Sequence, residues 1–92
     1  MDPSLKDTFL QHLRNRENEG DYFLARARAY WPNAFGKRVA QQTTELRRRK
    51  KTLFVYVNNA ALRHELHMLR EQIKDRVNEE AGEVWWEEVK VK

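Results

Sequence analysis

Five consecutive basic residues stand in the middle of the 92-residue chain, from Arg47 to Lys51. Adjacent cations repel one another, so this run stabilises nothing within the chain unless an anionic partner neutralises it. A nucleic-acid backbone is such a partner, because each phosphate neutralised by Lys or Arg releases a condensed counterion. A solvated turn that keeps a sheet edge from aggregating is the plainer alternative. We expect five side chains to grip phosphates from a hairpin tip: Arg47, Arg48, Arg49, Lys50 and Lys51.

The formal net charge of +4 is concentrated around this run. Residues 26–51 hold nine basic side chains and one acid, whereas residues 1–25 and 52–92 are each mildly negative. A positive segment between negative ends points to a phosphate-bearing partner more strongly than an evenly spread charge does. Two cations before the run and two on the following helix are expected to extend this line of phosphate contacts. The pair on the helix also fits an ordinary charged helix face. These four are Lys37, Arg38, Arg63 and Arg70.

A strand-like segment with two aromatic side chains follows the basic run. If Leu53, Val55 and Val57 face the core, the alternation of a strand turns Phe54 and Tyr56 to the opposite face. Two aromatic rings beside a basic tip resemble the platforms that hold single strands, where each stacked base contributes ~1–3 kcal/mol. An inward-facing pair, a dimer surface and cover by another segment are the alternatives.

Two adjacent tryptophans, Trp85 and Trp86, lie in a second strand-like segment near the C-terminus. Adjacent residues of a strand point to opposite faces, so we expect one indole inside and the other outside. An outward tryptophan often marks a partner site, and Trp86 is therefore a further candidate for base stacking. A rim tryptophan that shields the sheet is the alternative.

The residue types that support catalysis or metal binding are poorly placed. The chain has no cysteine, and His64, Glu65 and His67 lack the spacing that puts two imidazoles of a zinc protease on one metal. The only serine is Ser4, with no nucleophile elbow around it. We expect no enzyme, no metal, no cofactor and no small-molecule substrate. The acids near the C-terminus are expected to form a solvated face: Glu79, Glu80, Glu83, Glu87 and Glu88.

Two helices are predicted before the basic run. Ser4 caps the first, which ends near Gly20, and Asp21 caps the second. Pro32 is expected to end or bend the second helix, and Gly36 provides a further break.

The rest of the chain predicts strands around one long helix. The segments 39–49 and 53–57 are the first two strands, and 84–91 is the last. Between them, apolar residues from Leu62 to Val77 recur every three or four positions, which indicates an amphipathic helix. Asn58 and Asn59 are suitable caps for its start, and Gly82 closes it.

These elements give the order α-α-β-β-α-β. The long helix acts as a crossover, so a three-stranded sheet with helices on one face is the economical α+β architecture. Residues 1–92 form a single domain, in which residues 1–21 are an N-terminal helix and link. No segment has the length of a membrane span or the core of a signal peptide, and we expect a cytoplasmic protein.

The region 22–91 resembles the DciA-type domain, long catalogued as a domain of unknown function. The likeness depends on the order of a tryptophan and glycine, a Val-Ala start and threonine, a Leu-x-Val-x-Val strand, and a Leu-x-x-Glu-Leu helix with a later asparagine. The residues that carry it are Trp31, Gly36, Val39, Ala40, Thr43, Leu53, Val55, Val57, Leu62, Glu65, Leu66, Leu69 and Asn78.

The resemblance implies a fold similar to a type II K-homology domain without the GxxG loop. It also implies a role in bacterial replication initiation, in which such proteins bind DNA and help to load the replicative helicase onto single strands. Many members carry a flexible tail that takes part in helicase contact; this sequence stops at Lys92, and we expect a compact, tail-less member.

The residues and the resemblance together predict a non-catalytic protein that binds single-stranded or forked DNA and assists helicase loading. Two alternatives remain open at this point. One is a protein-interaction adaptor that docks a helicase or a second copy through its open sheet face. The other is an RNA-binding protein, because K-homology folds are shared with RNA binders.

Overall fold

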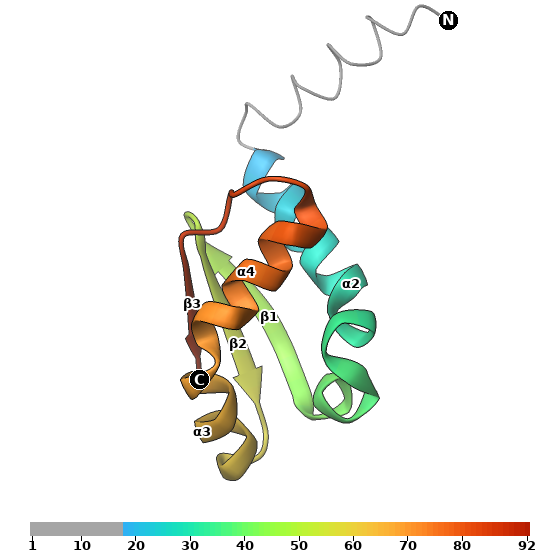
Figure 1. Cartoon of the computed structure of the whole chain (residues 1–92), viewed down its shortest axis with the longest axis vertical. Helices are drawn as coiled ribbons and strands as arrows, with labels where there is room; N and C mark the ends of the chain where they lie inside the picture. The colour runs from blue at the N-terminus through green and yellow to red at the C-terminus, as the bar shows by residue number, and fades with distance from the viewer. Residues whose placement is uncertain (1–17) are drawn as a thin grey trace, which may run out of the picture.

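The computed structural model describes residues 18–92, and its elements follow the predicted α+β order (Figure 1). The first helix predicted for residues 4–20, with Ser4 as its cap, lies almost entirely outside the described residues. The elements are α2 (Asn18–Gln42), β1 (Thr43–Arg49), β2 (Thr52–Val57), α3 (Ala60–Met68), α4 (Arg70–Ala81) and β3 (Glu88–Val91).

Helix α2 passes through Gly20 and Asp21, so the prediction that the first ends a helix and the second caps another is wrong. Gly20 is buried, and a Cβ added there would collide with the guanidinium of Arg48. The glycine thus lies where the Arg48 side chain packs on α2, and it does not end a helix.

The break in α2 lies at Gly36 and not at Pro32, which sits within the helix. Gly36 has φ 89° and ψ 161°, a conformation that glycine adopts without the steric cost other residues meet. Beyond it the chain is helical again to Gln42, so the strand predicted from Val39 begins only at Thr43. The Trp31 indole N–H donates to the Thr43 hydroxyl (3.0 Å), which donates to the Val39 carbonyl (2.7 Å). This relay ties both sides of the kink to the start of β1.

The sheet has the order β1-β2-β3, with β1 antiparallel and β3 parallel to β2. Helices α3 and α4 form the crossover between the parallel strands, and α4 crosses the sheet while α2 runs beside β1 (Figure 1). Leu53, Val55 and Val57 are buried, whereas Phe54 and Tyr56 are half-buried on the other face. The predicted alternation of β2 is confirmed, and one face of the sheet is left open.

The predicted long helix is two helices joined at Leu69, whose φ of −98° and ψ of 11° depart from helical geometry. The Asn59 side chain accepts from the Leu62 N–H (2.9 Å), so the predicted cap is confirmed. Gly82 ends α4 in the left-handed conformation, also as predicted. The buried stripe is interrupted at the joint, where Leu69 is exposed. In the described part of the chain, no helix has the length and apolarity that a bilayer crossing needs.

Trp85 and Trp86 are both buried, at 6% and 1% exposure, so the prediction that one of them faces outward is wrong. Strand β3 begins only at Glu88, and the irregular segment before it does not alternate as a strand does. Trp85 stacks on Phe23 with ring centroids 4.5 Å apart, and Trp86 meets Trp85 edge-on at 4.8 Å.

The buried amide of Asn78 holds this segment in place. Its Oδ1 accepts from the backbone N–H of Trp85 (3.1 Å) and of Trp86 (2.7 Å), and its Nδ2 donates to the Trp86 carbonyl (3.0 Å). One side chain thus satisfies both backbone groups of Trp86, which the turn from α4 to β3 buries, and shares the Trp85 N–H with the Glu83 carbonyl (3.1 Å).

We expect Asn78→Ala to lower the free energy of unfolding by about 2–4 kcal/mol, because the backbone groups would lose their partners in a buried site. Urea denaturation followed by tryptophan fluorescence measures the change. Glu79→Ala, at the exposed neighbouring position, is the control and should change stability by less than about 0.5 kcal/mol. Equal effects of the two substitutions would contradict this role for Asn78.

Candidate nucleic-acid interface

The basic run does not form one tip. Arg47, Arg48 and Arg49 belong to β1, and only Lys50 and Lys51 form the turn. Alternation along β1 puts Arg47 and Arg49 on the open face of the sheet and Arg48 on the face toward the helices. Arg48 donates to the Lys50 carbonyl (2.9 Å) and lies 3.4 Å from an Asp21 carboxylate oxygen. Arg48 is therefore engaged in holding α2 to the hairpin.

The hairpin tip, Lys50 and Lys51, is exposed and is anchored on one side. The backbone N–H of Glu87 donates to the Lys51 carbonyl (3.0 Å), and the Lys51 ammonium lies 5.7 Å from the centroid of the Trp85 ring. Lys50 has φ 53°, a left-handed conformation that costs a side-chain-bearing residue about 1 kcal/mol. The turn thus displays two cations at one end of the open face.

The open face carries what we call the aromatic platform: Phe54 and Tyr56 of β2 with Arg47 of β1 and Lys90 of β3. The pairing register places Phe54 between Arg47 and Lys90 across the three strands. The Arg47 guanidinium lies 5.9 Å from the centroid of Tyr56, and the Lys90 ammonium lies 6.0 Å from that of Phe54. Each ring therefore has a cation at cation–π distance, which is the pairing of charge and π surface that single-strand binders use.

Glu45 moderates the charge of this face. Its carboxylate accepts a hydrogen bond of 2.6 Å from Nε of Arg47, and this bond together with the carboxylate charge raises the pKa of Arg47 above its ordinary value. Both side chains are exposed, so the pair is screened by water. A phosphate approaching Arg47 must compete with this carboxylate.

Lys37 and Arg38 are exposed and lie before the start of β1, at the opposite end from the hairpin tip. A seven-residue strand spans roughly 20 Å, so these two cations do not continue the track that starts at the tip.

Arg63, Arg70 and Trp86 also lie off the platform. Arg63 is half-buried and donates to the Val57 carbonyl (3.0 Å), which fastens α3 to the end of β2. Arg70 is exposed at the joint between α3 and α4 and donates to the His67 carbonyl (2.8 Å). Trp86 is buried, and its ring has no surface for a base.

Lys90 and Lys92 are not among the cations predicted from the sequence to contact phosphate. The signal was present, because the segment from Glu88 to Lys92 alternates charged residues with valines, as a strand with one buried face does. Val89 is indeed buried and Lys90 exposed on the open face. The strand pattern alone predicts no contact to nucleic acid for the two lysines of this segment.

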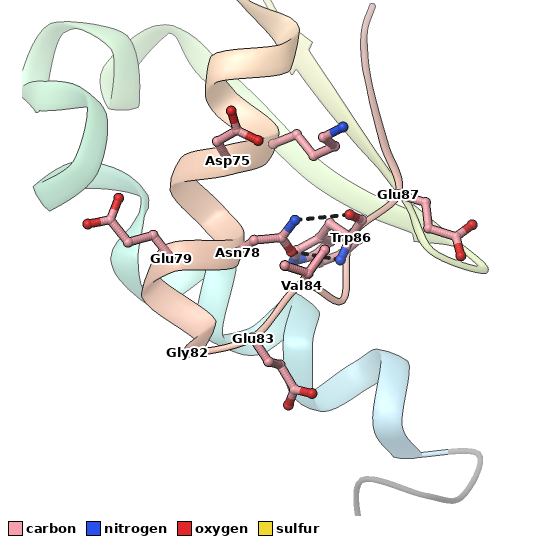
Figure 2. Close-up of a pocket in the computed structure, with 9 residues that line it drawn as sticks. Asp75, Asn78, Glu79, Gly82, Glu83, Val84, Trp86 and Glu87 are labelled. Carbon is pink, nitrogen blue, oxygen red and sulfur yellow. Dashed lines mark hydrogen bonds between the residues drawn. The ribbon is translucent and has the colours of Figure 1, made fainter.

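A hollow of about 660 Å³ lies between α4 and the segment before β3 and is acidic. Figure 2 shows the Glu79, Glu83 and Glu87 carboxylates pointing in different directions around it, with Asn78 inside. Within residues 18–92, no group of three or more His, Asp or Glu side chains is placed to hold a metal ion. A hollow with this charge repels phosphate.

The sequence matches the model of one protein family over residues 4–91, nearly the whole chain; the family is described as Dna[CI] antecedent, DciA. The chain belongs to the DciA family. This family is associated with helicase loading in DNA replication, which supports that general role here, and it is not a known class of enzyme. No curated protein matches the chain.

We expect Lys50→Gly to raise the free energy of unfolding by about 1 kcal/mol, because glycine adopts a positive φ without the clash that Lys50 meets. Thermal and urea unfolding measure the gain. Lys51→Gly is the control, since φ at Lys51 is not positive and glycine there only adds chain entropy to the unfolded state. A loss of stability in Lys50→Gly would contradict the prediction.

Proposed function

We propose that this DciA-family protein binds single-stranded DNA, free or at a fork, on the open face of its sheet and thereby assists loading of the replicative helicase. The observation that carries the proposal is the aromatic platform, in which Phe54 of the central strand lies between Arg47 and Lys90 of the two neighbouring strands and the Arg47 guanidinium lies 5.9 Å from the centroid of Tyr56. Replication takes place in the cytoplasm of bacteria, which is where we expect the protein to act.

The aromatic rings favour a single strand over a duplex. Bases in a duplex are stacked on one another and present only their edges, whereas an unpaired base can lay its face on Phe54 or Tyr56. Every base has such a face, so binding of this kind tolerates sequence variation. The rings are half-buried, which fixes their orientation while leaving surface for a ligand.

The cations supply the contacts to phosphates. Arg47 and Arg49 lie on the open face, Lys50 and Lys51 lie at its end, and Lys90 lies across from Arg47. Arg48 and Arg63 have structural partners and contribute mainly to the positive field. No catalytic step is part of the proposed function.

We expect Phe54→Leu with Tyr56→Leu to weaken binding of a labelled oligothymidylate by tenfold or more, because each stacked base contributes about 1–3 kcal/mol. Leucine keeps apolar cover over the sheet, and circular dichroism checks the fold. Tyr30→Leu is the matched control, since Tyr30 also lies under a cation, Arg76 at 6.0 Å, but on α2. Unchanged affinity in the double variant would overturn the role of the platform.

We expect Arg47→Gln with Arg49→Gln to reduce the dependence of log K on log salt by about 1.4, because each phosphate contact on a single strand contributes about 0.7. Fluorescence anisotropy across a salt series gives the slope. Lys37→Gln with Arg38→Gln removes the same charge at the far end of β1 and should leave the slope unchanged.

The same series separates the alternatives. Absence of binding to every nucleic acid at low salt would leave an adaptor that docks protein through this face. The rings stack on bases and do not distinguish the two sugars, so a preference for RNA must come from contacts to the 2′-OH. Tighter binding of an oligouridylate than of the matching DNA would therefore identify an RNA-binding protein.

A further inference from the structure

A hollow of about 310 Å³ follows the outer edge of β3, away from both the hairpin tip and the acidic hollow. On one side it is closed by the joint between α3 and α4, and on the other by β3 itself. We call it the edge hollow; its lining residues are His67, Arg70, Glu88, Val89, Lys90, Val91 and Lys92.

The edge hollow gathers positive charge. Arg70, Lys90 and Lys92 contribute cationic side chains and His67 an imidazole, and Glu88 is the one acidic side chain among the lining residues. Arg70 is positioned by its hydrogen bond to the His67 carbonyl (2.8 Å), and the same Nη1 lies 3.4 Å from Nε2 of His67. These contacts to His67 use Nη1 of the Arg70 guanidinium. The N–H groups of a guanidinium form a planar fork, which matches the spacing of two phosphate oxygens.

The free edge of the strand adds backbone donors. In the described sheet β3 has one neighbour, β2, so its other edge is not paired with a strand. Lys92 turns both its backbone groups toward β2, donating to the Val55 carbonyl (2.7 Å) and accepting from the Val57 N–H (3.1 Å). Backbone groups alternate in direction along a strand, so the N–H of Val91 points toward the free edge.

Lys90 connects the edge hollow with the aromatic platform. Its ammonium lies 6.0 Å from the centroid of Phe54, and the same residue lines the edge hollow. A strand whose base stacks on Phe54 would therefore bring its next phosphate to Lys90 and toward Arg70 and Lys92.

We propose that the edge hollow binds a phosphodiester group of the same single strand whose bases stack on Phe54 and Tyr56. The strand then crosses the sheet from Arg47 on β1 to Arg70 and Lys92 beyond β3, perpendicular to the β-strands. This inference rests on the proposed function and adds a second phosphate site to it, on the opposite side of the rings from the hairpin.

The test uses the full chain and a fluorescein-labelled octathymidylate in an anisotropy titration across a salt series. The edge variant, Arg70→Gln with Lys92→Gln, should lower the salt slope by about 1.4, which at 0.1 M salt corresponds to about 25-fold weaker binding. The control variant, Lys37→Gln with Arg38→Gln, has the same net charge and should leave the slope unchanged and affinity within about twofold. Thermal melting confirms that both variants fold.

A third variant gives a change of opposite sign, which misfolding cannot produce. Glu88→Gln removes the one acidic side chain that lines the edge hollow and should tighten binding about twofold to fivefold. Glu83→Gln, which removes an acid from the acidic hollow, should have a smaller effect.

The failures are distinguishable. One outcome is that the edge variant and the control variant have the same salt slope while the Phe54 and Tyr56 double variant loses affinity. In that case the edge hollow is not a phosphate site, and the proposed stacking of bases on the aromatic platform is retained. If the wild-type protein does not bind the octamer at low salt, both the proposed function and the edge hollow are overturned.

Discussion

Three hydrogen bonds from one buried amide determine where the working surface of this molecule lies. Asn78 holds the backbone of Trp85 and Trp86 at the end of α4, so both indoles enter the core and the chain turns toward β2. Strand β3 then runs parallel to β2, with Lys90 opposite Phe54. The platform and the edge hollow therefore both depend on a side chain that lies on neither. Replacing the amide removes support from the site as well as from the core.

The residues that carry the family pattern are structural, and the proposed ligand contacts lie between them. Trp31 and Thr43 form the relay that fixes the kink at Gly36, and Asn78 pins the last turn. In the Leu-x-Val-x-Val strand the named residues are buried, whereas the unnamed positions are Phe54 and Tyr56. The pattern thus identifies the scaffold and leaves the exposed alternate positions to supply the chemistry.

The parts of the fold that sequence predicted are those with local causes. The alternation of β2, the Asn59 cap and the Gly82 stop each depend on a few adjacent residues. The errors have distant causes. Gly20 lies inside α2 where the Arg48 side chain of β1 packs on it, and Trp86 is buried in an irregular segment whose backbone is hydrogen-bonded to Asn78 of α4.

The candidate site was predicted only in part, because some of its features have local causes and others depend on residues distant in the sequence. The position of Phe54 and Tyr56 on the open face was predictable from the alternation of β2. The division of the basic run between the two faces of the sheet depends on where β1 ends, which the sequence does not show. Lys37 and Arg38 are close to the run along the chain and far from it in space, and Lys90 is the reverse. Counting charge along the sequence therefore assigns to the site cations that are near the basic run only in sequence. It also misses the cations that the parallel strand β3 brings close to the run in space.

Carboxylates lie at both ends of the proposed path and would make binding of a strand moderate and reversible. Glu45 is bonded to Arg47 on one side of the rings, and Glu88 lines the edge hollow on the other. Each must be displaced or tolerated by an incoming phosphate, which lowers the net gain of every contact. A purely basic face would bind a strand more tightly and release it more slowly. Under the proposed function the protein must release its strand to the helicase, and acids interspersed among the cations are compatible with that release.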